Sequence, residues 1–145
     1  MMHPQIQSIA IAEIQNDTVE PLLTALARQE ISASFQTDNS LTLKSQNQAD
    51  CILYCRIISV KNRGVRYDSQ YDDDAYIPAE FAITVEAEFT VLIPGRSEPL
   101  IRKRTVQGSA HYQYNADPQI GKYYGLRQAC YQMARQMVEY TTEAW

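Results

Sequence analysis

The stretch FAITVEAEFTVLI, Phe81–Ile93, decides the fold. Apolar side chains recur at every second position, and most of the positions between them hold threonine or glutamate. Because successive side chains of a strand point to opposite faces, this alternation predicts a strand with one buried face and one wet face. Such strands are typical of an antiparallel sheet that is covered on one side only.

Other segments extend this sheet in both directions along the chain. PGRSEP, residues 94–99, predicts a hairpin turn, and Leu100–Tyr114 predicts a more polar strand nearer an edge. Upstream, a long strand is expected to begin at Ala49. LTLKS, residues 41–45, suits a short strand, and the isoleucine-rich segment Ile6–Ile14 reads as a largely buried strand.

Two segments have helical periodicity. We expect the first helix to be capped by Asp17 or Thr18, to hold Pro21 in its first turn and to reach about Ser34. The second follows the region of Gly121 and is about five turns long. Its apolar stripe has spacings of three and four and consists of Leu126, Cys130, Met133, Met137, Tyr140 and Ala144.

The predicted order is therefore β-α-β-β-β-β-α. We expect an α+β fold with a mostly antiparallel sheet of four to five strands and both helices packed on one face. The chain has 145 residues, which suits a single domain over residues 1–145.

Composition narrows the function classes. Hydrophobic residues make up 45 % of the chain, and the net charge of −4 argues against a nucleic-acid-binding protein, which would usually be basic. No apolar run approaches the roughly 18 residues of a membrane span. The first residues, MMHPQIQSI, do not resemble a signal peptide. Either the protein is intracellular or its leader lies outside this chain, and composition does not choose between these.

The spacing of Cys51 and Cys55 excludes a shared site. On a strand these residues lie about 13 Å apart, at roughly 3.3 Å per residue, which is too far for a disulfide or a common metal ion. Cys130 lies on the apolar stripe of the last helix. We expect all three cysteines to be small buried hydrophobic residues. A bridge from Cys130 to Cys51 or Cys55 is the alternative in an oxidising compartment.

Two basic runs are candidate anion contacts for phosphate or carboxylate. The first is Lys61, Arg63 and Arg66, for which a solvated hairpin is the alternative. The second is Arg102, Lys103 and Arg104. If its strand pairs with Phe81–Ile93, Glu86 and Glu88 lie across from these cations, and the second run is then structural.

An acidic, tyrosine-bearing stretch follows the first basic run. Asp68, Asp72, Asp73 and Asp74 lack the ligand spacing, glycine and terminal glutamate of an EF-hand, so a polar loop is favoured over a calcium site. Three of the chain's ten tyrosines, Tyr67, Tyr71 and Tyr76, are candidate interface residues. A second tyrosine cluster, which includes Tyr112, Tyr114, Tyr123 and Tyr124, suits either an interface or the ends of the core.

Catalytic motifs are missing from the sequence. It has no G-x-S-x-G, P-loop, H-E-x-x-H or G-x-G-x-x-G pattern, and His111 has no evident partner. We therefore expect a protein that is not an enzyme and that needs no metal and no cofactor. A deep pocket holding His111 beside an acidic residue would argue the other way.

Five segments of the chain together form a recognisable pattern. They are SIAIAEIQNDTVEPLLTALARQEI, ADCILYCRI, AEFAITVEAEFTVL, GSAHY and VEYTTEAW, in that order. Their features are an N-x-T-x-E-P-L turn into the first helix, an Ala-Asp pair before an apolar strand, and a long terminal helix. In these features the chain resembles the LptE family of lipopolysaccharide-assembly lipoproteins, and the order, spacing and length agree over nearly the whole chain.

This resemblance implies an outer-membrane lipoprotein that faces the periplasm. Its relatives plug the LptD β-barrel, assist the assembly of that barrel and help deliver lipopolysaccharide. The resemblance also implies a lipidated N-terminal cysteine, but no cysteine precedes Cys51, so the anchor and a short tether are expected outside this chain. The basic residues named above are candidate lipopolysaccharide contacts by charge alone. Another cell-envelope α+β module, which binds a peptide or glycan through Tyr67, Tyr71 and Tyr76, is the alternative.

Overall fold

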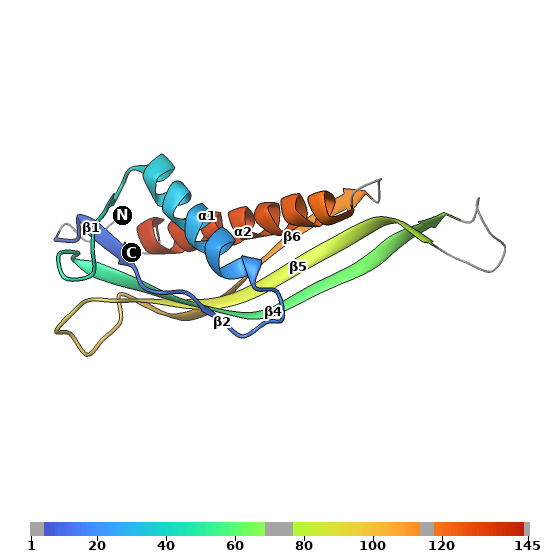
Figure 1. The fold of residues 1–145 in the computed structure, drawn as a ribbon. Helices are drawn as coiled ribbons and strands as arrows, with labels where there is room; N and C mark the ends of the chain where they lie inside the picture. The colour runs from blue at the N-terminus through green and yellow to red at the C-terminus, as the bar shows by residue number, and fades with distance from the viewer. Residues whose placement is uncertain (1–4, 69–76, 114–117, 144–145) are drawn as a thin grey trace.

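The computed structural model describes residues 5–68, 77–113 and 118–143 (Figure 1). The elements are β1 (Ser8–Ile11), β2 (Gln15–Asn16), α1 (Leu22–Asp38), β3 (Thr42–Leu43), β4 (Cys51–Asp68), β5 (Ile77–Leu92), β6 (Ile101–Gln113) and α2 (Pro118–Glu143). Both helices lie on the same face of the sheet (Figure 1). The α+β class predicted from the sequence is confirmed.

The sheet is mixed and six-stranded, so the prediction of a mostly antiparallel sheet of four to five strands is wrong in part. β4, β5 and β6 are antiparallel neighbours, as predicted, and β6 lies at an edge. β1 pairs in parallel with both β3 and β4, and β2 pairs in parallel with β4. The cause is α1, because a helix between two strands returns the chain to the end of the sheet from which it left.

The expected strand over Ile6–Ile14 is divided by one extra residue. Ile11 pairs with Leu53 and Gln15 with Arg56, so four steps along the first segment match three along β4. This offset has the residue count of a β-bulge. Arg28 of α1 donates weak hydrogen bonds to the carbonyls of Ile11 and Ala12, at 3.5 and 3.4 Å. α1 thereby binds the carbonyls where the pairing is interrupted.

The core lies between the helices and one face of the sheet. From Ile83 to Val91 of β5, every second residue is buried, and the residues between them are half-buried on the open face. The stripe of α2 packs against this face, with Leu126, Cys130, Met133 and Met137 buried; Ala144 lies outside the described residues. The alternation in β5 and the stripe in α2 are both confirmed.

A side-chain-built turn leads into α1. Asn16 Oδ1 accepts hydrogen bonds from the Thr18 N–H at 3.0 Å and the Thr18 hydroxyl at 2.7 Å. Asn16 Nδ2 donates to the Glu20 carbonyl, and Thr18 Oγ1 accepts from the Glu20 N–H. These bonds make the N-x-T-x-E-P-L motif a turn that precedes the helix. The predicted cap at Asp17 or Thr18 is therefore wrong.

The helix itself is displaced along the chain from its predicted position. Pro21 is the N-cap residue, without a side-chain cap bond. The helix passes the predicted end at Ser34 and stops only at Asn39, whose left-handed φ of 62° terminates it. Phe35, fully buried, is the physical reason for the extension, since it adds one more apolar residue to the face on the core.

Candidate functional site

Two basic side chains that have no ion-pair partner among the described residues lie on the open face of the sheet, toward the end at which β4 and β5 are connected. Lys61 lies opposite Thr84, and Arg63 lies opposite Ala82. Thr84 and Ala82 in turn lie opposite Ser109 and His111 of β6. The side chains of Lys61 and Arg63 are exposed, and neither forms an ion pair with any described residue.

The remaining residues of this hairpin extend beyond β6. The last β5–β6 pair is Glu80 with Gln113, whereas β4 and β5 stay paired as far as Asp68 with Ile77. Arg66 and Tyr67 fall in this extension by their backbone positions. The predicted contacts Tyr71 and Tyr76, and the aspartates Asp72, Asp73 and Asp74, lie outside the described residues.

The second basic run does not form one cluster. Lys103 lies 3.7 Å from Glu88 on the open face, which confirms the expected pairing with that glutamate. The expectation for Glu86 is wrong, because Glu86 lies opposite Gln107. Arg104 lies opposite Phe89 and stacks over the ring of Tyr140 of α2, 3.7 Å from its centre. Arg102 is exposed and has no ion-pair partner within residues 5–68, 77–113 and 118–143.

Glu88 is the centre of a charge-balanced network at the proximal part of the open face. It accepts hydrogen bonds from Arg56 Nε and Nη2, at 2.9 and 2.7 Å, and Arg56 also contacts Asp17. The hydrogen bond from Arg56 is the main cause that lowers the pKa of Glu88. The charges of Asp17, Arg56, Glu88 and Lys103 compensate one another, whereas Lys61 and Arg63 have no ion-pair partner among the described residues.

All three cysteines are free and buried, as predicted. Burial raises the pKa of each thiol to about 12. Thiolate chemistry is therefore suppressed in the folded protein, because the thiolate is the reactive form. No group of metal-ligating side chains occurs among the described residues.

His111 has an acidic neighbour that the sequence did not reveal. Its Nδ1 lies 3.3 Å from Glu80 Oε1 on the open face, with 60 % of the histidine side chain exposed. The nearby Ser109 hydroxyl lies 3.1 Å from the hydroxyl of Thr84. The pair lies on an open surface, and no hydrogen bond in the described part of the chain joins His111 to a nucleophile. This is not the deep pocket that would indicate catalysis.

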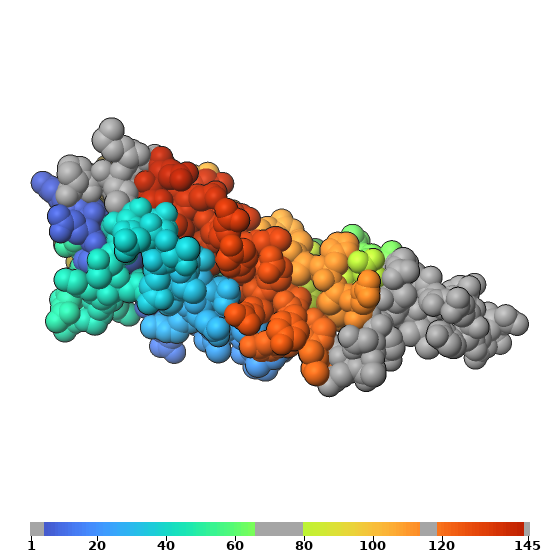
Figure 2. Space-filling model, turned by 90° about the horizontal axis from the view of Figure 1, so that it is seen from above, coloured from blue at the N-terminus to red at the C-terminus, as the bar shows by residue number. Residues whose placement is uncertain are grey.

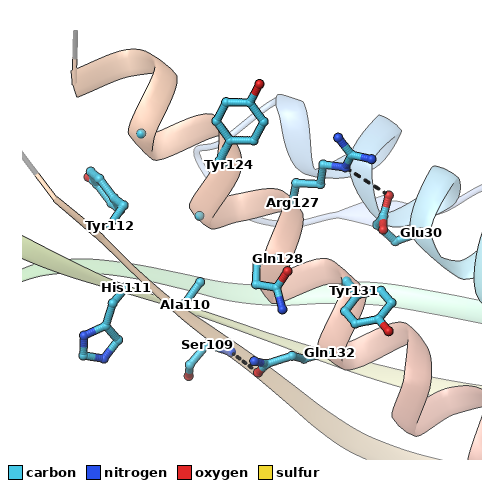
Figure 3. Close-up of a pocket in the computed structure, with 12 residues that line it drawn as sticks. Glu30, Ser109, Ala110, His111, Tyr112, Tyr124, Arg127, Gln128, Tyr131 and Gln132 are labelled. Atoms are coloured by element: carbon cyan, nitrogen blue, oxygen red, sulfur yellow. Dashed lines mark hydrogen bonds and ion pairs between the residues drawn. The ribbon is translucent and has the colours of Figure 1, made fainter. Parts of the chain in front are cut away.

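A shallow depression of about 870 Å³ runs along α2 beside the edge strand β6 (Figure 3). Tyr124, Gln128 and Tyr131 of α2 line it, together with Ser109–Tyr112 of β6. Tyr112 also stacks on Phe81, with ring centres 5.2 Å apart, and thereby closes the end of the core. Tyr124 is 60 % exposed. Tyr112 therefore fits the prediction of a residue at the end of the core, Tyr123 and Tyr124 are exposed, and Tyr114 lies outside the described residues.

Two glutamines of α2 bind the exposed edge of β6. Gln132 Oε1 accepts a hydrogen bond from the Ser109 N–H at 2.9 Å. Gln136 Nε2 donates to the Gln107 carbonyl at 2.8 Å, and its Oε1 accepts from the Gln107 N–H at 3.5 Å. These contacts were not predicted from the sequence, although the four-residue spacing of the glutamines is a signal that they share one helix face.

Comparison with known proteins gives a family and a fold. The LptE family model, described as lipopolysaccharide assembly, matches residues 6–141. No curated protein sequence matches the chain. Neither helix, over its described residues, is long and apolar enough to cross a bilayer.

Several solved structures share the fold at low identity. A minor lipoprotein from Acinetobacter baumannii has a TM-score of 0.58 and 13 % identity, over 95 % of this chain and 92 % of that one. Protein XCC0632 from Xanthomonas campestris has a TM-score of 0.63 and 12 % identity, over 97 % and 88 %. PelC from Paraburkholderia phytofirmans, a dodecamer, has a TM-score of 0.58 and 10 % identity, over 98 % and 93 %. Since the family model spans nearly all of the sequence, the chain belongs to the LptE family of lipopolysaccharide-assembly proteins.

Proposed function

We propose that this chain is a non-catalytic outer-membrane lipoprotein, with residues 1–145 forming one LptE-like domain. In this proposal it plugs and supports an LptD β-barrel and assists lipopolysaccharide transport and assembly at the outer membrane. A lipid anchor that precedes this domain in the natural precursor would hold it at the periplasmic face. The family match over residues 6–141 carries the proposal.

The surface of the sheet supports this role. From Thr84 to Thr90 of β5 the open face is polar and half-buried, as suits a wall that faces a water-filled lumen. The proximal end of this face also carries the exposed side chains of Tyr54 and Leu92. The molecule is elongated, with both helices along one side (Figures 1 and 2). That shape suits insertion along the axis of a barrel.

Lipopolysaccharide contact is proposed at the distal cations. Phosphate groups form strong charge-assisted hydrogen bonds with lysine and arginine. Lys61 and Arg63 are the first candidates for this contact, because they have no competing ion pair in the described residues. Arg66 is the next candidate because of its position in the strand, and Arg102 because it is exposed. Lys103 and Arg104 already have partners in Glu88 and Tyr140 and rank last. Tyr67, Tyr71 and Tyr76 remain candidate contacts to the barrel.

Purification from outer membranes tests the proposal. The natural precursor, tagged at its C-terminus, should be recovered with a large β-barrel protein at about equal molar amounts. A control variant that replaces Glu98 with glutamine should be recovered to the same extent, because Glu98 lies exposed in the turn between β5 and β6. Recovery from soluble extract without any barrel protein would refute the proposal.

A further inference from the structure

Along the free edge of β6, the backbone N–H and C=O groups of every second residue point away from β5. Residue pairing between β5 and β6 is unbroken from Glu80–Gln113 to Phe89–Arg104. In an antiparallel strand the backbone groups that point away from the neighbour belong to every second residue. The outward backbone groups of Gln107 and Ser109 form hydrogen bonds with glutamines of α2. Because His111 is two residues further along the strand, its N–H and C=O also point outward.

A third glutamine of α2 is placed for His111 but does not bind it. Four residues of helix rise about 6 Å, close to the roughly 6.8 Å of two strand residues, so Gln136, Gln132 and Gln128 keep step with β6. Gln128 is exposed and makes no hydrogen bond to any described residue. It lines the depression beside β6 instead (Figure 3).

The uncovered part of the edge is bounded on both sides. Toward the start of β6, Gln132 binds the N–H of Ser109. Toward its end, α2 approaches so closely that a methyl group on Gly121 would lie 3.4 Å from the Gln113 carbonyl. The window between these points consists of the Ser109 carbonyl and both backbone groups of His111.

We propose that this window binds an extended polypeptide segment of the β-barrel partner, which adds to β6 as a short strand. This inference rests on the proposed function and names the place and the chemistry of one contact. The outward N–H and C=O of His111 can form hydrogen bonds with the C=O and N–H of a residue in another extended chain. The neighbouring positions already hold glutamine amides, the same chemical group as a peptide bond. A lipid acyl chain supplies neither donor nor acceptor.

The depression supplies room for the side chains of such a segment. It lies directly beside the window, and Tyr112, Tyr124 and Tyr131 line it. Aromatic side chains of this kind are enriched at protein interfaces because they combine apolar area with a polar tip. A segment of only a few residues fits, since Gln132 and Gly121 limit the window.

Paired proline substitutions in the full lipidated chain, co-expressed with the barrel, test this contact. His111→Pro removes the outward N–H and leaves the ladder to β5 intact, because an edge residue whose N–H faces outward tolerates proline. Thr105→Pro controls for the proline itself, since Thr105 points outward in the same register but lies away from the window. His111→Ala, which loses the contact with Glu80 but keeps the outward N–H, controls for the side chain and should bind as the unaltered chain does. We expect His111→Pro to weaken barrel binding about 3- to 10-fold, as for the loss of one hydrogen bond, and Thr105→Pro to leave it unchanged.

Hydrogen exchange on the unaltered complex gives a second measurement that needs no variant. The His111 amide should exchange at least about tenfold more slowly in the complex than in the free chain. If the complex forms but His111 is not protected, the inference is wrong and the proposed function stands. If no barrel complex forms, both fail. Protection of His111 by self-association of the free chain would assign the window to a second copy and overturn the proposal.

Discussion

A methyl group on Gly108 would lie 1.9 Å from the carbonyl oxygen of Ala129, so β6 and α2 meet there backbone against backbone. Gly108 is the first residue of the GSAHY motif. Glycine is required at this position because any side chain would push the helix off the strand. The glutamine contacts to the β6 edge depend on the same close approach.

Replacing Gly108 with alanine should therefore destabilise the protein by about 3 kcal/mol, the upper part of the range for overpacking. Urea unfolding followed by circular dichroism measures this loss. Gly95→Ala is the control, because Gly95 has open space around it and only a left-handed φ of 83° to strain. It should cost about 1 kcal/mol. Equal losses for the two variants would contradict the backbone contact.

The Ala-Asp pair before β4 predicts a pH dependence. Asp50 Oδ2 accepts hydrogen bonds from the N–H groups of Gln7 and Ser8, at 2.9 and 3.2 Å, and the Gln7 bond is the main cause that lowers the pKa of Asp50. A lowered folded-state pKa stabilises the fold above the unfolded value of about 3.9, and this stabilisation disappears as the pH falls through the folded value.

Asp50→Asn should thus have a lower Tm than the unaltered protein at pH 7, and the difference should shrink below about pH 4. Thermal unfolding at a series of pH values measures it. Glu98→Gln, an exposed carboxylate with no hydrogen bond among the described residues, serves as control and should show no such convergence. A difference between Asp50→Asn and the unaltered protein that is constant from pH 7 to pH 3 would exclude a role for the charge.

The sequence predicts those parts of the fold and of the candidate site that follow from the periodicity of apolar residues. The alternation around Val85 and the stripe through Met133 predicted the buried faces of β5 and α2, because burial repeats with the geometry of the element. The parallel pairing of β1 was missed, since the hydrophobic pattern of a short buried strand does not encode its direction.

Contacts made by single polar residues were predicted only where the pairing of two strands implies them. The ion pair of Lys103 with Glu88 followed from strand pairing and was predicted, but the stacking of Arg104 on Tyr140 required the position of α2. The proposed contacts to lipopolysaccharide and to the barrel remain predictions, because charge alone does not select between partners.

The part of the β6 edge that Gln132 and Gln136 cover predicts an effect on self-association. Replacing both Gln132 and Gln136 with alanine exposes the N–H and C=O groups of Gln107 and the N–H of Ser109. Unpaired strand edges pair with other chains, so the double variant should form dimers and larger species at concentrations where the unaltered protein does not. Sedimentation velocity measures this. Glu139→Ala, on the exposed side of α2, should remain unchanged; an unchanged double variant would show that the glutamines do not protect the edge.

Reversing the distal charges should weaken lipopolysaccharide binding without unfolding the domain. The variant replaces Lys61, Arg63 and Arg66 with glutamate, and a pull-down with immobilised lipopolysaccharide at two salt concentrations measures the effect. We expect at least a tenfold loss at low salt that narrows at high salt, because ionic contacts are screened. Arg96→Glu, in the turn between β5 and β6, controls for a charge reversal at an exposed position away from this cluster. Undiminished binding would remove these residues as contacts.

The buried thiols predict slow chemical labelling. Native protein at pH 8 should react with a thiol reagent orders of magnitude more slowly than unfolded protein, since burial raises each thiol pKa to about 12. Cys51→Ala should cost about 1–2 kcal/mol through a small cavity. Rapid modification of Cys51 in the native state would contradict its burial.

These thiols also link the folding of the chain to its redox history. An unfolded copy offers three reactive groups to any oxidant, whereas a folded copy offers none. In an oxidising compartment, oxidation of these thiols therefore competes with the folding of the chain. The oxidation state of the cysteines in a purified sample then shows whether the chain folded before its thiols were oxidised.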